Sequence, residues 1–278
     1  MYLNEEIVQD IIERSIQEDI WTGDLTGNLL IDNSSVGKAF IIAKEEGIIA
    51  GLPIAEKVFL RLTDEIIFKY LLTDGTMVQP GDIIAEVKGP AREILKGERI
   101  ALNFLQRMSG IATRTSLYVK AVSEYPVKIV DTRKTTPTLR ILEKYAVRVG
   151  GGFNHRMGLY DAVMIKDNHI TAIGGITPAV KKAKEQLAHT VKIEVEVENL
   201  GEVQEALDIG VDIIMLDNMN ISEMSRAVNI INGDAVVEAS GGITLDGLAE
   251  VAATGVDIIS VGALTHNIKS LDISLNME

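Results

Sequence analysis

The sequence lacks cysteine altogether. Without a thiol the chain can form no disulfide, offers no thiolate nucleophile and cannot bind zinc or an iron–sulfur cluster through sulfur. A chain of 278 residues without cysteine also fits a reducing compartment. We therefore expect a protein of the cytoplasm.

Long hydrophobic runs and an excess of positive charge are missing as well. No stretch approaches the ~18 consecutive apolar residues that a membrane span needs. The N-terminal MYLNEEIVQD is acidic and lacks the basic region and apolar core of a signal peptide. A formal net charge of −13 argues against nonspecific binding of DNA or RNA, which needs a basic face. We expect a soluble protein that binds neither membranes nor nucleic acid, although a local cationic pocket is compatible with the net charge.

The common short catalytic motifs are also absent. The sequence has no GxxxxGK[ST] loop, no GxGxxG opening a helix, no HExxH and no GxSxG. Its four histidines, at positions 155, 169, 189 and 266, show no spacing typical of metal ligands. The chemistry must therefore be sought in residues that only the fold brings together.

The proportions of hydrophobic residues (46%) and charged residues (24%) are those of a globular protein. The first hundred residues mix the two kinds of secondary structure. Helices are predicted from Asn4 and from about Pro53, and a long helix over 98–123. Strands are predicted over 37–44, 66–72 and 83–88.

From residue 127 onward, short apolar runs alternate with amphipathic helical segments. The runs cover 127–130, 162–165, 191–197, 213–216, 235–237 and 258–261. Repeated strand–helix units imply a parallel sheet with right-handed crossovers. A complete (β/α)8 barrel needs eight units and six are visible, so an incomplete α/β barrel is predicted, with an open doubly wound sheet as the alternative. In both folds the chemistry gathers at the C-terminal ends of the strands.

The run at 191–198 alternates between apolar and charged residues. Period-two alternation places Glu194 and Glu196 on the face opposite Ile193 and Val195. If the apolar face packs on helices, the glutamates point into the barrel, where they need a partner. Lys134, Lys166 or a bound divalent cation would serve. The alternative is an edge strand with a solvated acidic face.

Cationic side chains gather at the predicted strand ends of this acidic protein. They are Arg133, Lys134, His155, Arg156 and Lys166. A focused positive site inside a negative shell suits a small polyanion. Near the C-terminus, small residues follow two successive strands, in Ser240-Gly241-Gly242 and Val261-Gly262-Ala263, and such segments can bind phosphate through backbone N–H groups.

Several motifs together resemble the quinolinate phosphoribosyltransferase family. The signature run is DTRKTTPTLRILEKYAVRVGGGFNHRMGLYDAVMIKDNH, followed in order by EVEVENL, IIMLDNM, EASGGI and SVGALTHN. EDIWTGDLT and GERIALNFLQRMSGIAT match upstream, so the resemblance covers nearly the whole chain.

The resemblance implies an N-terminal α/β sandwich domain over 1–110, joined by the C-terminal tail 266–278, and a catalytic α/β barrel over 111–265. It implies a reaction of quinolinate with 5-phosphoribosyl-1-diphosphate and Mg²⁺ that yields nicotinate mononucleotide, CO₂ and pyrophosphate, in the biosynthesis of NAD. It also implies a homodimer or higher homo-oligomer, in which Arg99 reaches the active site of the neighbouring subunit.

The same resemblance assigns roles to individual residues. Arg133, His155, Arg156 and Lys166, with Arg99 of the partner subunit, would hold the two carboxylates of quinolinate, and Thr135 would also bind substrate. Lys134 would contact the phosphoribosyl donor or lie between the substrates. Lys134, Lys166, Glu196 and Asp217 would be catalytic, and Glu196 and Asp217 would face the ribose and its magnesium, which the diphosphate would hold in the main. Ser240, Gly241 and Gly242, with Val261, Gly262 and Ala263, would bind the 5-phosphate.

Two other functions remain open at this point. One is a paralogue of the same fold, such as the proteins associated with molybdenum transport or a nicotinate-specific enzyme. The full cationic set favours a dicarboxylate instead. The other is a non-catalytic sensor of phosphorylated metabolites, which would keep the glycines but would not need Glu196 and Asp217.

Overall fold

The computed structural model describes residues 3–278 and separates into two compact units. The first unit comprises the residues up to Ser116, with Thr135–Gly151 and Leu264–Glu278; the second comprises Leu117–Lys134 and Gly152–Ala263. Over the described residues, no helix combines the length and apolar character that crossing a membrane requires.

The first unit is built on a four-stranded sheet in the order β12-β1-β5-β3. Its strands are β1 (Val36–Ala43), β3 (Ile67–Tyr70), β5 (Ile83–Pro90) and β12 (Ile273–Met277). All three pairings are antiparallel, so the last strand of the chain is held beside β1. Ala39, Ile41 and Ala43 are fully buried and alternate with less buried residues along β1, as expected of a sheet that is covered on one face.

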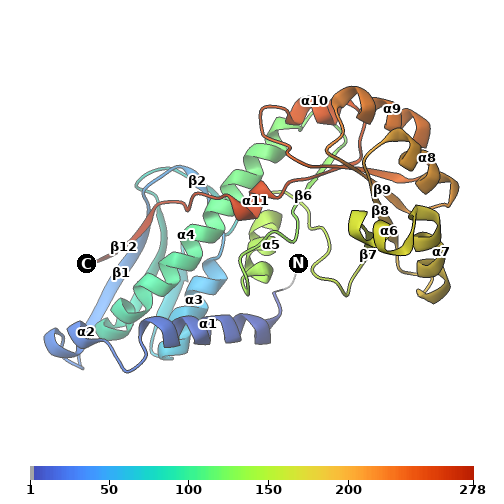
Figure 1. Cartoon of the computed structure of the whole chain (residues 1–278). Helices are drawn as coiled ribbons and strands as arrows, with labels where there is room; N and C mark the ends of the chain where they lie inside the picture. Colours follow the sequence, from blue (N-terminus) through green and yellow to red (C-terminus); the bar gives the residue numbers. More distant parts are fainter. Residues whose placement is uncertain (1–2) are drawn as a thin grey trace. The chain divides into compact units, whose positions relative to one another are not determined.

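The unit also contains helices, some of which lie along this sheet (Figure 1). They are α1 (Glu5–Asp19), α2 (Leu25–Leu30), α3 (Leu52–Leu62), α4 (Ala91–Ala121) and α5 (Arg140–Val149). Asn4 caps α1, because its side chain accepts the Ile7 N–H at 3.2 Å. The long helix α4 begins seven residues before the predicted start at residue 98, and buried Ala91 and Ile94 extend its apolar face. A short pair, β2 (Gly47–Ile48) and β4 (Met77–Val78), completes the unit.

The second unit contains a six-stranded parallel sheet in the order β6-β11-β10-β9-β8-β7. Its strands are β6 (Lys128–Val130), β7 (Val163–Ile165), β8 (Ile193–Val197), β9 (Ile213–Asp217), β10 (Val236–Ser240) and β11 (Ile258–Ser260). Each strand begins within two residues of the start of a predicted apolar run. Each strand ends within one residue of the end of that run, except β10, which ends three residues later. The six-stranded parallel sheet predicted from the sequence is confirmed.

The order of the strands decides between the two predicted architectures. From β7 to β11 each strand pairs with the next in sequence, and β11 then pairs with β6, the first strand. In a doubly wound sheet the order of successive strands reverses at a switch point. From β7 to β11 the strand order in this sheet runs one way only. The incomplete barrel is therefore confirmed, and the doubly wound alternative is wrong.

Helices of the second unit form an outer layer around the sheet (Figure 1). They are α6 (Asp167–Ile173), α7 (Ile176–Gln186), α8 (Leu200–Asp208), α9 (Ile221–Ile231) and α10 (Leu248–Ala253). The short helix α11 (Ala263–His266) follows β11 and belongs to the first unit from Leu264 onward. Because β8 lies between β7 and β9, the alternative of an acidic edge strand is wrong. The glutamates of β8 are instead inside the unit.

Candidate active site

The polar residues of the second unit lie along one edge of its sheet. The strands are parallel and in register, with Ser240 opposite Asp217 and Ser260 opposite Val130, so their C-terminal ends share this edge. The edge gathers most of the predicted site residues. They are Arg133 and Lys134 after β6, Lys166 after β7, Glu196 on β8, Asp217 at the end of β9, Ser240, Gly241 and Gly242 at the end of β10, and Val261, Gly262 and Ala263 after β11.

Lys166 and Glu196 form an ion pair across β7 and β8. The side chains are 39% and 13% exposed, respectively, so the pair is partly shielded from water. The Lys166 backbone N–H donates to His169 Nδ1 at 3.0 Å, which fixes the first turn of α6. Lys166 is one of the alternative partners predicted for the β8 glutamates, and the structure pairs it with Glu196. The paired lysine presents its charge at the edge where the other cations lie.

Arg133 and Arg156 are close enough to repel each other. Burial and, after it, the positive charge of Arg133 lower the pKa of the Arg156 guanidinium, while Glu194 and Asp161 act in the opposite direction. Arg156 also donates to the Ala162 carbonyl at 3.1 Å. Two guanidinium groups held together against their repulsion create a site that an anion stabilises.

Asp131 anchors the loop that carries Arg156. Its side chain is completely buried at the end of β6, and it accepts hydrogen bonds from the Asn154 side chain and, at 3.0 Å, from the His155 backbone N–H. No role was predicted for Asp131 from the sequence. The available signal was an acidic residue directly after an apolar run, beside two cations.

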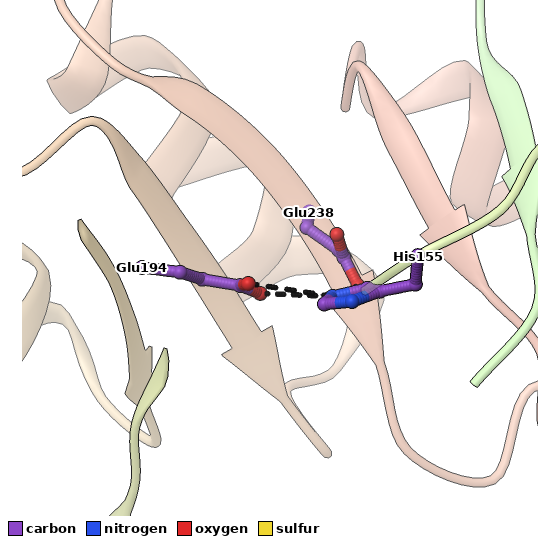
Figure 2. A group of neighbouring side chains, drawn as sticks. All are labelled: His155, Glu194 and Glu238. Atoms are coloured by element: carbon purple, nitrogen blue, oxygen red, sulfur yellow. Dashed lines mark hydrogen bonds and ion pairs between the residues drawn. The ribbon is translucent and has the colours of Figure 1, made fainter. Parts of the chain in front are cut away.

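His155 turns its ring toward two buried glutamates (Figure 2). Its Nε2 lies 3.3 Å from an oxygen of Glu194 and 3.5 Å from an oxygen of Glu238. Glu194 was expected to pair with Lys134, Lys166 or a cation, and the structure gives it His155 instead, because Glu194 lies two residues deeper in the barrel than Glu196. These three side chains could hold a metal ion, a grouping that spacing in the sequence could not reveal. Glu238 was not among the predicted site residues.

The loop after β10 has the backbone of an anion site. Gly241 and Gly242 have φ angles of 93° and 59°, a left-handed conformation that glycine adopts without strain. A Cβ on Gly241 would come within 2.2 Å of Asn218 Oδ1, whereas one on Gly242 would meet nothing within 4 Å. Backbone N–H groups in such turns point into a concave surface that suits an anion.

Two predicted site residues belong to the first unit. Arg99 is an exposed residue of α4. Thr135 accepts a hydrogen bond from Arg140 Nε at 2.9 Å through its hydroxyl oxygen. Their predicted roles in substrate binding stay predictions.

The donor set of the edge fits a hard divalent cation. Glu196 and Asp217 supply carboxylate oxygens from adjacent strands, and Mg²⁺ characteristically takes one or two carboxylates while phosphates and water complete its coordination. Asp217 also accepts from the Asn218 amide at 2.7 Å, which orients its carboxylate.

Comparison with known proteins covers both units. The model of the N-terminal domain of quinolinate phosphoribosyl transferase matches residues 24–109, and that of its C-terminal domain matches residues 111–276. A probable nicotinate-nucleotide pyrophosphorylase (carboxylating) of Bacillus subtilis is 46% identical over 275 residues, which cover 99% of this chain and 95% of the relative.

Solved structures agree along the whole chain. A nicotinate-nucleotide pyrophosphorylase from Francisella tularensis has a TM-score of 0.96 at 45% identity, covering 100% of this chain and 98% of that one. NadC from Streptococcus pyogenes has a TM-score of 0.96 at 41% identity, covering 100% and 99%. This chain therefore belongs to the quinolinate phosphoribosyltransferase family.

Proposed function

We propose that this enzyme converts quinolinate and 5-phosphoribosyl-1-diphosphate into nicotinate mononucleotide, CO₂ and pyrophosphate, a step in the biosynthesis of NAD. Family membership supports the reaction class. The observation that carries the choice of substrate is the pair of repelling guanidinium groups, Arg133 and Arg156, in a protein of net charge −13. A dicarboxylate relieves this repulsion, because each carboxylate can take one cation.

The cations divide between two anionic substrates. Arg133, Arg156 and Lys166 would hold the quinolinate carboxylates, with Arg99 of a second subunit, and Lys134 would contact the phosphoribosyl donor. The predicted contact of His155 with quinolinate stays a prediction, and its Nε2 lies beside Glu194 and Glu238. Thr135 stays a predicted substrate ligand.

Glu196 and Asp217 would act on the ribose. Displacement of pyrophosphate at the anomeric carbon develops positive charge on the sugar, and nearby carboxylates stabilise that charge. Glu196 forms an ion pair with Lys166 at this edge. These two carboxylates would also hold Mg²⁺ together with the diphosphate, and the metal, when bound, would neutralise the leaving group.

The 5-phosphate would bind to backbone N–H groups. Ser240, Gly241 and Gly242 end one strand, and Val261, Gly262 and Ala263 follow the next. The left-handed glycines support this assignment, because they open a concave backbone surface at the correct edge of the sheet.

Loss of CO₂ needs little further chemistry from the protein. Once the pyridine nitrogen carries the ribose it is cationic, and the carbanion left by departure of the adjacent carboxylate is stabilised by that charge. The protein holds the other carboxylate and the ring in place, which is a proximity effect.

We also propose a homodimer. Trp21, Leu25, Leu29 and Leu30 are 78–82% exposed and lie on and beside α2. Large apolar side chains clustered on a surface indicate a contact with another protein, and a second copy would cover them. The same assembly would let exposed Arg99 serve a neighbouring site. The cytoplasmic location expected from the sequence stays a prediction.

The test is to incubate the purified protein with quinolinate, 5-phosphoribosyl-1-diphosphate and Mg²⁺ and to measure nicotinate mononucleotide by mass spectrometry. We expect product with quinolinate and little with nicotinate. Product from nicotinate alone would indicate a nicotinate-specific enzyme. Binding of the phosphorylated compound without turnover would indicate a sensor.

A further inference from the structure

Asp131 is a buried carboxylate to which the proposed reaction gives no role. It is the first residue after β6, and it is fully buried. Burying a carboxylate is costly unless its oxygens accept hydrogen bonds. Oδ1 of Asp131 accepts the His155 backbone N–H at 3.0 Å, and Oδ2 accepts from the Asn154 side-chain amide. One side chain therefore holds two successive residues of another segment of the chain.

The backbone joins the same two segments. The Phe153 N–H donates to the Ile129 carbonyl at 2.8 Å, and the Asp131 N–H donates to the Phe153 carbonyl at 3.2 Å. Val130 and Phe153 thus form a parallel bridge. Because β6 is the end strand of the six-stranded sheet, the segment 153–155 lies along the edge of β6 that does not face β11. Asp131 is bonded to this segment through both its backbone and its side chain.

The first of the two segments leads into Arg133, two residues after Asp131. Within it, the Thr132 hydroxyl accepts the Lys134 N–H at 3.0 Å. A hydroxyl that accepts the N–H two residues later closes a local turn, and Arg133 lies inside that turn. The position of the Arg133 backbone is therefore tied to that of Asp131.

The second segment leads into Arg156, which follows His155. Its guanidinium donates to the Ala162 carbonyl at 3.1 Å, which directs the side chain toward the start of β7. Arg133 and Arg156 repel each other, and this repulsion contributes to the lowered pKa of Arg156. Two segments without a junction could move apart and separate the guanidinium groups, and the junction at Asp131 opposes that movement.

The chemistry of this junction calls for a carboxylate at position 131. Its partners, the His155 N–H and the Asn154 amide, are both donors, and an ionised carboxylate accepts at either oxygen. Asp131→Asn would keep the shape of the side chain, but its NH₂ group would face one of the two donors. This substitution should therefore loosen the junction without creating a cavity.

We propose that Asp131 is a positioning residue for substrate selection: its two hydrogen bonds fix the spacing of Arg133 and Arg156, and that spacing selects a dicarboxylate with neighbouring carboxylates over a monocarboxylate. A dicarboxylate needs two cations at a set distance, whereas a monocarboxylate needs one. The proposal rests on the proposed function, because the dicarboxylate is quinolinate. The junction itself does not depend on that function.

The binding test uses isothermal titration calorimetry with quinolinate and with nicotinate, which lacks one of the two carboxylates. We expect Asp131→Asn to weaken quinolinate binding about tenfold through misplacement of one cation, and to change nicotinate binding much less. Equal weakening of both ligands, or no weakening of either, would overturn the proposal. A wild type that binds quinolinate no more tightly than nicotinate would refute the proposed function as well.

Exchanging the two side chains of the junction supplies a rescue. In Asp131→Asn/Asn154→Asp, the carboxylate at position 154 can accept from the amide at position 131, whose oxygen can still accept the His155 N–H. We expect the double variant to recover the wild-type ratio of quinolinate affinity to nicotinate affinity. A double variant as unselective as Asp131→Asn would show that the hydrogen bonds of the junction do not set the spacing.

Asp257→Asn is the matched control, because Asp257 also accepts a backbone N–H in the same unit. Its Oδ2 accepts the Val237 N–H at 2.8 Å near the start of β10, away from the C-terminal ends of the strands. Both single variants should lower the urea midpoint, and Asp131→Asn alone should lower the affinity ratio. An equal fall of the ratio in Asp257→Asn would show that reduced stability is the cause, and would overturn the proposal.

The junction can also be measured in the wild-type protein, independently of the substrate. In hydrogen–deuterium exchange followed by NMR, we expect the His155 N–H to exchange as slowly as the Phe153 N–H, which bonds to a backbone carbonyl. Rapid exchange of the His155 N–H would overturn the proposal and leave the proposed function intact. If Asp131→Asn does not fold, Asn154→Ala removes one of the two hydrogen bonds and should lower the affinity ratio in the same direction. An unchanged ratio in Asn154→Ala would overturn the proposal.

Discussion

Arg133 and Lys134 are neighbouring cations at the end of a buried strand, and both are exposed. Because the two residues are neighbours in the sequence, their positive charges repel each other. Arg156 lies close enough for the charge of Arg133 to lower its pKa as well. An anionic substrate resolves the problem, since each cation then contacts a separate negative group. Residue-scale tests can therefore separate the two substrates.

Arg133→Ala should raise the KM for quinolinate roughly tenfold to a hundredfold, the cost of a lost charge-assisted hydrogen bond, and should change the KM for the donor far less. Steady-state kinetics with each substrate varied in turn would measure this. Arg14→Ala, an exposed arginine paired with Asp10 on α1, is the control and should change neither constant. Equal effects of Arg133→Ala on both substrates would remove Arg133 from the quinolinate site.

The raised pKa of Glu238 predicts a pH dependence of stability. Its folded value of about 7 exceeds the ordinary value, so between pH 4.5 and 7 the folded state binds more protons than the unfolded state. The free energy of unfolding contributed by this group therefore falls as pH rises through that window. Urea midpoints of the wild type should fall relative to Glu238→Gln between pH 5 and 8. A constant difference would show that Glu238 keeps an ordinary pKa.

Some residues of the site were not predictable from the sequence for a physical reason. Lys166 was among the partners predicted for the two glutamates of β8, because those glutamates lie on a recognisable alternating strand. Glu238 and Glu194 lie on different strands, and their contact with His155 depends on how the barrel curves. A one-dimensional pattern contains the alternation of a strand but not the curvature of a sheet.

At the scale of elements, the loop after β10 gives the clearest prediction. Gly241→Ala must accept a left-handed φ of 93° and a contact of 2.2 Å with Asn218. We expect a loss of about 1–3 kcal/mol in stability and a raised KM for the phosphoribosyl donor, measured by urea unfolding and initial rates.

Gly233→Ala is the matched control for this loop. Gly233 has a similar φ of 86°, but a Cβ there would meet nothing within 4 Å. It lies between α9 and β10, and so before the N-terminal end of β10. It should lose stability through backbone strain alone, with the donor KM unchanged. An unchanged donor KM in Gly241→Ala would argue against a phosphate site at this loop.

Most elements were predictable because their periodicity is strong, and the misplaced boundaries have local causes. The helix after β10 begins only at Leu248, since residues 245–247 form a turn. The strand at 235–237 continues to Ser240, because Glu238 is a charged residue that the structure buries. Polar residues inside a strand hide its true length from a search for apolar runs.

At the scale of the whole molecule, the winding of the second unit followed from its repeated strand–helix units, whereas the assembly did not. The domain boundaries near residues 110 and 265 stay a prediction. Exposed Arg99 and the apolar residues around α2 support a dimer. Residue periodicity predicts helices and strands, and it does not predict which surface contacts a second subunit.

Mixing two inactive variants tests the shared site. In an exchanged mixture of Arg99→Ala and Glu196→Gln, each heterodimer should contain one site with both residues intact, so equal amounts should recover about a quarter of wild-type activity. Rates after subunit exchange, with the dimer checked by sedimentation, would measure this. Recovery of no activity from an exchanged dimer would show that Arg99 serves its own subunit.

In the proposed function, the cationic edge binds quinolinate for phosphoribosyl transfer and decarboxylation. The most direct measurement uses quinolinate labelled with ¹³C in the 2-carboxylate and follows labelled CO₂ and nicotinate mononucleotide together. We expect equal amounts of both, only when 5-phosphoribosyl-1-diphosphate is present. Labelled CO₂ without the donor, or a nucleotide that keeps the label, would contradict it.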